Sequence, residues 1–361
     1  MQKERICYFD FIRALSTISI IIFHFNCSLA PHMVYGGDNA IILYNYKNGN
    51  LGQIGVSLFF ILSGASLMYN YGDKLSLKKY YTKRWLAIFP MFYLAWISAT
   101  LFYMFRFFSL NPFCVDREPW TITLTILGLD GYLCSLIPNY YLLGEWFLGC
   151  ILIMYVFFPL IRFLFKKVNP WFILFGYAAI YLLIVANYNL DFSIEYFVFT
   201  RLLEFIFGMF LIERGNKVNT VSVLISGSVV TLWSCVYINI PQMCKTTIMG
   251  ISLYIILMFI GQKLDKNGNF FFRYVSKLSY AIFLCHHIVI DQICTRFDGR
   301  MYGKHETYVI LVMSFIMIFF VATLLYNLHE KTISFFCKKD NSHHNCPSTT
   351  TQTKTKTPPN I

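Results

Sequence analysis

The first apolar block of the chain, residues 12–29, reads IRALSTISIIIFHFNCSL and decides the fold class. A helix needs about 20 mainly apolar residues to cross the hydrocarbon core of a bilayer. We therefore predict that this block is a transmembrane helix. A cleaved signal peptide fits the block poorly, because Arg13 and His24 lie inside it and no clean small-residue cleavage site follows.

The rest of the chain repeats this pattern. Its 361 residues are 57% hydrophobic and only 13% charged, whereas an ordinary soluble domain has roughly 25% charged residues. A soluble helical protein with such long uncharged runs would have no polar face for water, and the sequence lacks the short alternating segments of a membrane barrel. We predict an all-α, polytopic integral membrane bundle of about ten transmembrane helices. The expected spans are residues 12–29, 52–70, 86–108, 141–165, 171–187, 194–213, 220–239, 245–262, 271–293 and 306–328.

The segment 120–137 is a weaker candidate span, because it contains Gly128, Asp130 and Gly131. We interpret it as an interfacial or re-entrant piece of a long loop. If it crossed the membrane, the orientation of every later helix would invert. With ten spans and a cytoplasmic N-terminus, 21 of the 30 Lys and Arg residues fall in cytoplasmic segments and 6 in outer loops. The positive-inside rule therefore predicts that both termini are cytoplasmic.

This placement also explains the net charge of +12 as membrane topology, so no nucleic-acid partner is predicted. We assign residues 1–335 to one transmembrane domain. Residues 336–361, rich in Ser, Thr, Lys, Pro and Asn, are expected to form a disordered cytoplasmic tail. The eleven cysteines show no C-x-x-C spacing, so neither a metal centre nor a disulfide framework is predicted.

Ionisable residues inside a membrane span need a partner or a water-filled cavity. Arg13 and His24 are eleven positions apart, so they face the same side of a helix and lie about 16 Å apart along its axis. A snorkelling arginine and a hydrogen-bonded core histidine are the alternative, structural explanation. Lys83 and Arg84 open the third span, where they either mark topology or bind a phosphorylated ligand.

Three further spans carry such residues. Glu145 begins the fourth span, close to the expected outer interface. Arg201 and Glu204 stand at i and i+3 on one face of the sixth span, and mutual neutralisation would explain them structurally. The ninth span holds the adjacent pair His286 and His287, which point about 100° apart, so we expect only one of them to face the core.

Taken in order, these segments resemble the type-three membrane acyltransferases, bacterial proteins that O-acylate glycans and have relatives in animals. The first helix is similar to the family's Arg-x10-His helix through Arg13 and His24, and the ninth is similar to its Ser-Tyr-x5-His motif through Ser279, Tyr280 and His286. The quoted segments are YFDFIRALSTISIIIFHF (8–25), GVSLFFILSGASL (55–67), YYTKRWLAIFP (80–90), GEWFLGCILIMYVFFPLI (144–161), RLLEFIFGMFL (201–211) and LSYAIFLCHH (278–287).

Two positions depart from the family pattern. Ala87 stands where the family often has a second arginine, so only Arg84 is kept. Ile151 stands where some members carry a glutamate, and the acid precedes the tryptophan instead, as Glu145. The chain resembles the capsule and exopolysaccharide branches more than the peptidoglycan branch.

The resemblance implies acyl transfer, usually of acetyl, from cytoplasmic acetyl-coenzyme A to a sugar hydroxyl of a surface polysaccharide or lipid-linked glycan. It implies a multi-pass protein of the bacterial plasma membrane, among lipids, with acyl-coenzyme A as a substrate and no permanently bound cofactor. His24 would be the general base or a transient acyl carrier, and Arg13 would orient it or stabilise negative charge. The remaining expected roles are donor phosphate binding by Arg84 and Lys83, sugar binding by Glu145, completion of the core site by His286, and substrate-binding or structural roles for Arg201, Glu204, Ser279 and Tyr280.

Three other classes remain open on the sequence. A flippase or transporter would also bury charges, but it commonly shows internal repeats or broken helices, and we detect neither. A glycan polymerase would need large outer loops, and residues 109–140 form only a moderate one. A noncatalytic membrane sensor is the third alternative.

Overall fold

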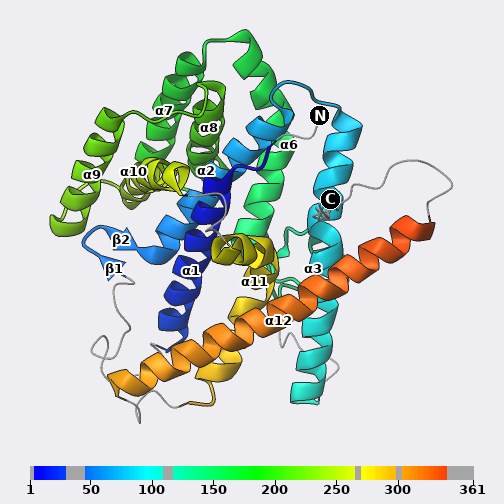
Figure 1. The fold of residues 1–361 in the computed structure, drawn as a ribbon. Helices are drawn as coiled ribbons and strands as arrows, with labels where there is room; N and C mark the ends of the chain where they lie inside the picture. The colour runs from blue at the N-terminus through cyan, green and yellow to red at the C-terminus, as the bar shows by residue number, and fades with distance from the viewer. Residues whose placement is uncertain (1–3, 30–44, 109–116, 265–269, 298–302, 340–361) are drawn as a thin grey trace, which may run out of the picture.

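The computed structural model describes residues 4–29, 45–108, 117–264, 270–297 and 303–339 (Figure 1). Within these residues, ten helices of 16 residues or more each overlap one of the ten predicted spans. They are α1 (Cys7–Leu29), α2 (Leu51–Tyr71), α3 (Leu77–Phe107), α6 (Glu145–Lys167), α7 (Pro170–Ala186), α8 (Val198–Glu213), α9 (Thr220–Cys235), α10 (Gln242–Lys263), α11 (Phe270–Cys294) and α12 (Lys304–Lys339). The smaller elements are β1 (Asn45–Tyr46), β2 (Gly49–Asn50), the 3-10 helix η2 (Pro119–Thr121), α4 (Ile122–Ile126) and α5 (Asp130–Leu133).

Within the described residues, six helices are long and apolar enough to cross a membrane, namely α1, α2, α3, α6, α10 and α12. α7 and α9 are apolar but have only 17 and 16 residues. The all-α membrane bundle is thus confirmed, while the number of ten crossings and the side of the two termini stay predictions. α12 continues to Lys339, into the predicted tail, and residues 340–361 lie outside the described part.

The connection between α3 and α6 holds only short helical pieces where it is described. α4 has five residues and α5 has four, so each rises less than about 8 Å at 1.5 Å per residue. Neither can cross a bilayer. This agrees with the interpretation of 120–137 as a non-spanning segment, and it places these pieces beside the beginning of α6, because α5 packs on α6.

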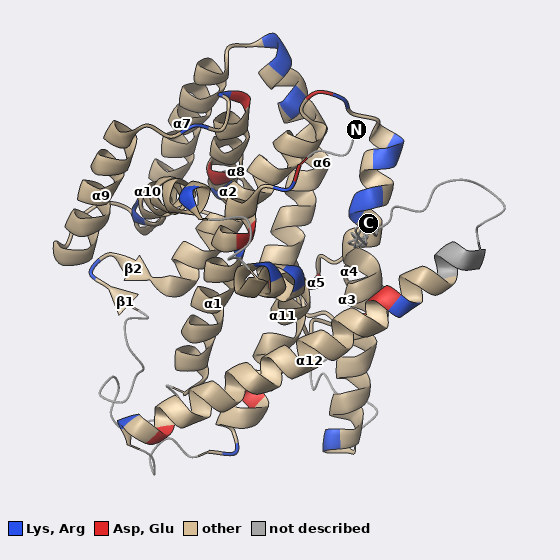
Figure 2. Ribbon diagram, in the orientation of Figure 1, with Lys and Arg blue, Asp and Glu red and all other residues tan. Residues whose placement is uncertain are grey.

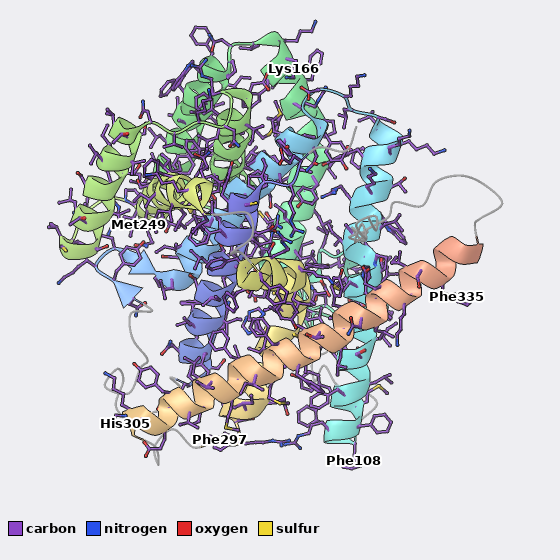
Figure 3. The ribbon with its side chains drawn as sticks, viewed as in Figure 1. Phe108, Lys166, Met249, Phe297, His305 and Phe335 are labelled. Carbon is purple, nitrogen blue, oxygen red and sulfur yellow. The ribbon has the colours of Figure 1, made fainter. Side chains whose placement is uncertain are left out.

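The surface of the bundle is apolar, as a lipid-facing surface must be. Large side chains project outward from α3, α7 and α12, and Phe108 and Phe335 are 95% and 66% exposed (Figure 3). Lys and Arg concentrate at helix ends, and those at the beginning of α3 and the end of α6 lie at the same end of the molecule as the N-terminus (Figure 2). These two groups belong to the set predicted to be cytoplasmic, and the side of the membrane on which they lie stays a prediction.

The core forms where α1 packs against α2, α10 and α11 and where α2 packs against α8. Two glycines allow α2 and α8 to touch backbone to backbone. A Cβ on Gly64 would lie 2.0 Å from the carbonyl oxygen of Phe205, and one on Gly208 would lie 1.9 Å from that of Ile61. Small residues at such crossings let membrane helices approach closely, so this pair fixes the register of the two helices.

We expect Gly208→Ala to destabilise the bundle by at least about 1–3 kcal/mol, because its methyl group forces α2 and α8 apart and overpacking costs this much. Thermal unfolding in detergent measures the effect. Gly227→Ala is the matched control, since a Cβ at Gly227 on α9 meets nothing within 4 Å. Equal stability of the two variants would contradict the close backbone approach.

Candidate active site

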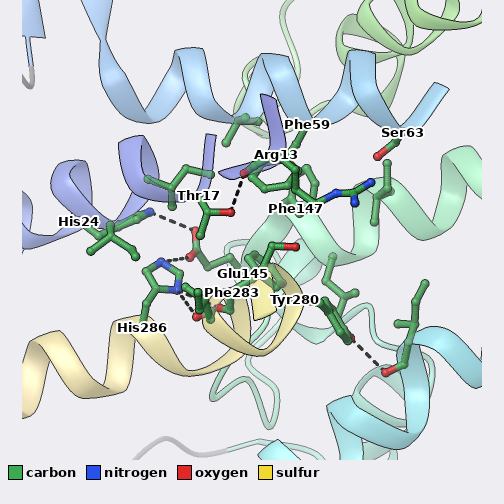
Figure 4. A pocket seen from close by; sticks show the side chains of 18 of the residues that line it. Arg13, Thr17, His24, Phe59, Ser63, Glu145, Phe147, Tyr280, Phe283 and His286 are labelled. Atoms are coloured by element: carbon green, nitrogen blue, oxygen red, sulfur yellow. Dashed lines mark hydrogen bonds and ion pairs between the residues drawn. The ribbon is translucent and has the colours of Figure 1, made fainter. Parts of the chain in front are cut away.

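Four titratable side chains from three helices meet in the interior. His24 comes from α1, Glu145 from the first residue of α6, and His286 and His287 from α11. The Glu145 carboxylate lies 3.7 Å from Nε2 of His24, 3.4 Å from Nε2 of His286 and 2.8 Å from Nε2 of His287. Figure 4 shows His24 and His286 directed at Glu145 from opposite helices. Three imidazoles thus surround one carboxylate.

The backbone around Glu145 fixes the position of its carboxylate. Glu145 itself has a φ of 41°, and Gly144 before it has a φ of 94°. A non-glycine residue in this left-handed region is held there by its surroundings. A Cβ on Gly131 would lie 2.6 Å from the Glu145 carbonyl oxygen, so the α5 segment packs directly against this turn and holds it in place.

Hydrogen bonds to the backbone orient His286. Its Nδ1 lies 2.9 Å from the carbonyl oxygen of Phe283 and 3.1 Å from that of Ile282. A nitrogen between two carbonyl oxygens donates its proton, which leaves Nε2 with a free lone pair towards Glu145. The His286 side chain is 1% exposed and that of His287 is 42% exposed.

His287 was not singled out by the sequence. His286 is the buried member of the pair, as expected of one of the two histidines, but His287 also reaches the carboxylate. The two ring centroids are 4.7 Å apart, and both rings contact the same Oε1 atom of Glu145. Helical spacing alone gives no sign of this, since the position of Glu145 depends on another helix.

A cavity of about 180 Å³ extends from this cluster to Arg13. Arg13 lies on α1, eleven residues before His24. The cavity is walled by aromatic and aliphatic side chains of α1, α2, α6 and α11 (Figure 4). The predicted site residues that line it are Arg13, His24, Glu145, Ser279, Tyr280 and His286. The shared helix face predicted for Arg13 and His24 is therefore the face that lines this cavity.

Arg13 is engaged at the far end of the cavity and does not contact His24. Its guanidinium donates to Oγ of Ser276 at 3.1 Å and lies 4.0 Å from the carboxylate of Asp10. Asp10 also accepts from Ser276 at 2.7 Å and from Nε of Arg5 at 2.7 Å. Any effect of Arg13 on chemistry at His24 would therefore act through a bound substrate.

Arg84 and Lys83 lie away from this cavity. Arg84 is half-buried beside the rings of Tyr71 and Tyr155, 5.9 Å from each centroid, and it lines a separate hollow of about 570 Å³. Tyr155 lines both spaces. Lys83 is exposed. The structure thus does not bring these two cations to the histidine cluster.

Arg201 and Glu204 form a fully buried ion pair at 3.4 Å outside the cavity. Nε of Arg201 donates to the carbonyl oxygen of Glu195 at 2.7 Å, and Glu204 accepts from Ser57 and Thr247. The pair is hydrogen-bonded inside the protein core, as the structural explanation requires. The guanidinium of Arg201 also lies 5.5 Å from the ring of Trp146, the residue after Glu145.

Asp130 of α5 is buried close to this turn, outside the long helices. Its Oδ1 accepts from the Gly131 amide at 2.9 Å, whereas Oδ2 has no hydrogen-bond partner among the residues that the structure describes. Burial raises the pKa of Asp130 to about 7, partly offset by the hydrogen bond from the Gly131 amide. The folded state therefore favours the neutral carboxyl.

This shift predicts a pH-dependent stability. Because the folded pKa of Asp130 lies above its ordinary value of 3.8, the contribution of this residue is most favourable below pH 4 and is lost as the pH rises to 7. The loss is about 4 kcal/mol at most. Asp130→Asn should remove this slope, whereas Asp191→Asn, at an exposed aspartate, should retain it. Melting curves of both variants between pH 5 and 8 test this, and equal slopes would contradict the assignment.

A family model described as an acyltransferase domain matches residues 6–327. The chain belongs to acyltransferase family 3. The match spans nearly the whole acyltransferase, from the beginning of α1 to the last third of α12, and includes all four members of the histidine–glutamate cluster. No curated protein and no solved structure matches the chain.

Proposed function

We propose that this membrane acyltransferase is an O-acetyltransferase of the bacterial plasma membrane, which transfers acetyl from cytoplasmic acetyl-coenzyme A to a sugar hydroxyl of a surface or exported polysaccharide. The main support is His24, which lies 3.7 Å from a carboxylate in a cavity that is also lined by Arg13. A hydroxyl is a poor nucleophile at neutral pH, and histidine is the side chain best suited to accept its proton.

The proposed reaction has two coupled parts. Nε2 of His24 accepts the sugar hydroxyl proton while the hydroxyl oxygen bonds to the thioester carbonyl carbon. The carbon–sulfur bond then breaks, and the coenzyme A thiolate takes from His24 the proton that came from the sugar hydroxyl. The products are an O-acetyl sugar and free coenzyme A, so atoms and charge balance. Glu145 stabilises the imidazolium form of His24 during the transfer.

The length of the cavity suits an extended donor. Arg13 and His24 lie about 16 Å apart along α1, and the cavity that both residues line has mostly apolar walls. The pantetheine arm of coenzyme A would occupy this length, with its thioester at His24 and its phosphates towards the basic end of the bundle. Ser279 and Tyr280 would then line the arm.

For the phosphates we propose Arg84, with Lys83 beside it. Nε of Arg84 is buried and has no hydrogen-bond partner among the described residues. The guanidinium can therefore donate a hydrogen bond to an anionic ligand. Arg84→Ala should raise the apparent KM for acetyl-coenzyme A about 10- to 100-fold, since a hydrogen bond to a charged group contributes about 1.5–3 kcal/mol. Arg84→Lys should restore donor binding only in part, because lysine lacks the bidentate fork.

The measurement is the initial rate against donor concentration in membranes that contain each variant. Lys79→Ala, at an exposed lysine one turn earlier on α3, is the matched control and should leave the donor KM unchanged. An unaltered KM in Arg84→Ala would contradict the donor assignment while leaving the acyl transfer itself intact.

The main alternative is a transporter or polymerase of polysaccharide or lipid-linked glycan without acyl transfer. Turnover of acetyl-coenzyme A separates the classes. Membranes that contain the protein should release coenzyme A and form a glycan ester in equal amounts, and membranes without it should not. Glycan movement or polymerisation without coenzyme A release would favour the alternative. Mass spectrometry of surface polysaccharide from a deletion strain would identify the acceptor.

A further inference from the structure

The two oxygens of the Glu145 carboxylate have different neighbours. Oε1 lies 2.8 Å from Nε2 of His287 and 3.4 Å from Nε2 of His286, whereas Oε2 lies 3.7 Å from Nε2 of His24. All four candidate ligand atoms lie within 4.8 Å of one another. Oε1 and the two α11 nitrogens thus form a compact triangle, and His24 stands beside it on the other oxygen (Figure 4).

Two atoms with lone pairs face each other where His286 meets Glu145. Nδ1 of His286 donates to backbone carbonyl oxygens, so Nε2 presents a lone pair. It faces the lone pairs of Oε1 at 3.4 Å, and Nε2 of His286 has no hydrogen-bond partner within the described part of the chain. His286 is fully buried. Two buried electron-rich atoms directed at each other are unfavourable unless a nearby positive charge neutralises them, and either a protonated His287, 2.8 Å from Oε1, or a bound metal ion would supply that charge.

The distance between His286 and Glu145 favours a metal ion over a shared proton. A charge-assisted N–H···O bond brings the heavy atoms to about 2.7–2.9 Å, and the 3.4 Å between His286 and Glu145 is longer. Ligands on a tetrahedral zinc ion, with bonds of about 2.0–2.1 Å, lie roughly 3.3 Å apart. The His286 contact, at 3.4 Å, is close to that value, whereas the His287 contact, at 2.8 Å, has the length of a charge-assisted N–H···O bond.

We propose that Glu145, His286 and His287 bind one divalent zinc-type metal ion. Two histidines and one glutamate, with a fourth position left open, form a common ligand set of catalytic zinc sites. The backbone carbonyls of Ile282 and Phe283 hold His286 in the orientation that metal-ligating histidines usually require. Cysteine spacing in the sequence predicts no metal site, and these ligands come from two helices and stand 141 positions apart in the chain.

The proposed ion has a consequence that rests on the proposed function. The open position would face His24, so a sugar hydroxyl could bind the ion through its oxygen and pass its proton to Nε2 of His24. A bound cation stabilises the resulting alkoxide. The bonds that form and break are otherwise those of the acetyl transfer above. Metal binding itself does not depend on that function.

Metal content of the purified protein tests the site directly. The full chain is purified in detergent through a tag without histidine, treated with chelator, supplied with Zn²⁺ and analysed by mass spectrometry for metals. We expect about one zinc ion per chain in the wild type. His286→Gln and His287→Gln should each weaken zinc binding at least ten-fold. His329→Gln is the matched control, because His329 is a buried histidine of α12 outside the cluster.

Two further measurements guard against misfolded variants and surface binding. Co²⁺ in the wild-type site should give the visible absorption of a tetrahedral ion, which an adventitious surface ion would not. Zn²⁺ should raise the melting temperature of the wild type and of His329→Gln but not of His287→Gln, since a ligand that binds only the folded state stabilises it. His287 is partly exposed, so its replacement disturbs packing little.

A wild type that binds neither ion, or cluster variants that bind as well as the wild type, would overturn the metal site. The outcome for the acetyltransferase is separate. Full acetyl transfer by chelator-treated protein would contradict the catalytic role of the ion and leave both the metal site and the proposed function standing. Stoichiometric zinc in a protein that transfers no acetyl group would contradict the proposed function and leave the metal site standing.

Discussion

His24→Gln should insert and fold normally, still bind acetyl-coenzyme A, and lose about 100- to 10,000-fold of the acetyl-transfer rate, the usual cost of removing a general base. Glutamine can hydrogen-bond but cannot accept a proton effectively. His24 stands next to the Glu145 carboxylate and lines the cavity that also holds Arg13. The rate of ester formation at saturating donor, normalised to folded protein, measures this effect.

A histidine-to-glutamine substitution at another buried position supplies the control. His329→Gln removes a buried histidine that lies outside the cavity and the cluster, and it should keep the wild-type rate. Size-exclusion profiles and donor binding show whether His24→Gln is folded. Retention of more than about a tenth of the wild-type rate in folded His24→Gln would be too small a loss for the chemical role, and the histidine would then be structural.

Arg201→Met should destabilise the bundle by about 3–5 kcal/mol, the cost of leaving one member of a buried ion pair without its partner. Glu204 would keep its bonds from Ser57 and Thr247 but lose the guanidinium at 3.4 Å. The double variant Arg201→Met/Glu204→Gln should recover much of this loss, because the amide carries no charge and retains hydrogen bonds. Unfolding measured for the two single variants and the double variant gives the coupling energy.

The same variants separate the two explanations of the pair. If Arg201 is structural, folded Arg201→Met protein keeps its KM for the sugar acceptor, and any loss of rate follows the loss of folded protein. A variant of wild-type stability with a strongly raised acceptor KM would instead establish a substrate-binding role, against the burial of both side chains.

Much of the fold could be predicted because a bilayer imposes simple requirements on sequence. Each of the ten expected spans overlaps one long helix. A long apolar run in a bilayer must satisfy its own backbone hydrogen bonds, and a helix does so. The boundaries shift where polar residues extend a helix beyond the apolar core. α3 begins at Leu77, nine positions before the predicted span, because its first turns are basic and lie outside hydrocarbon.

The candidate site could be predicted only in part. Helical periodicity placed Arg13 and His24 on one face, and both line the cavity. It could not show that Glu145 would meet three histidines, because a left-handed turn and the α5 segment set its position. Nor could it separate Arg84 from the cavity, since the intervening Tyr155 belongs to another helix.

Asp10 was also missed, although it binds Arg5 and lies 4.0 Å from Arg13. In sequence it reads as an ordinary acid near the beginning of an apolar block. Its burial depends on α11, which supplies the hydroxyl of Ser276 at 2.7 Å. Contacts between helices distant in the chain therefore account for most of what the sequence did not show.

Acetyl transfer by the purified protein tests the central claim most directly. The wild type and His24→Gln are reconstituted in proteoliposomes with a polysaccharide acceptor and acetyl-coenzyme A that carries a labelled acetyl group. We predict that the wild type forms labelled sugar ester and free coenzyme A in equal amounts and that His24→Gln forms neither above background. Folded wild-type protein that binds the donor but forms no ester, or equal ester formation by both proteins, would contradict the account.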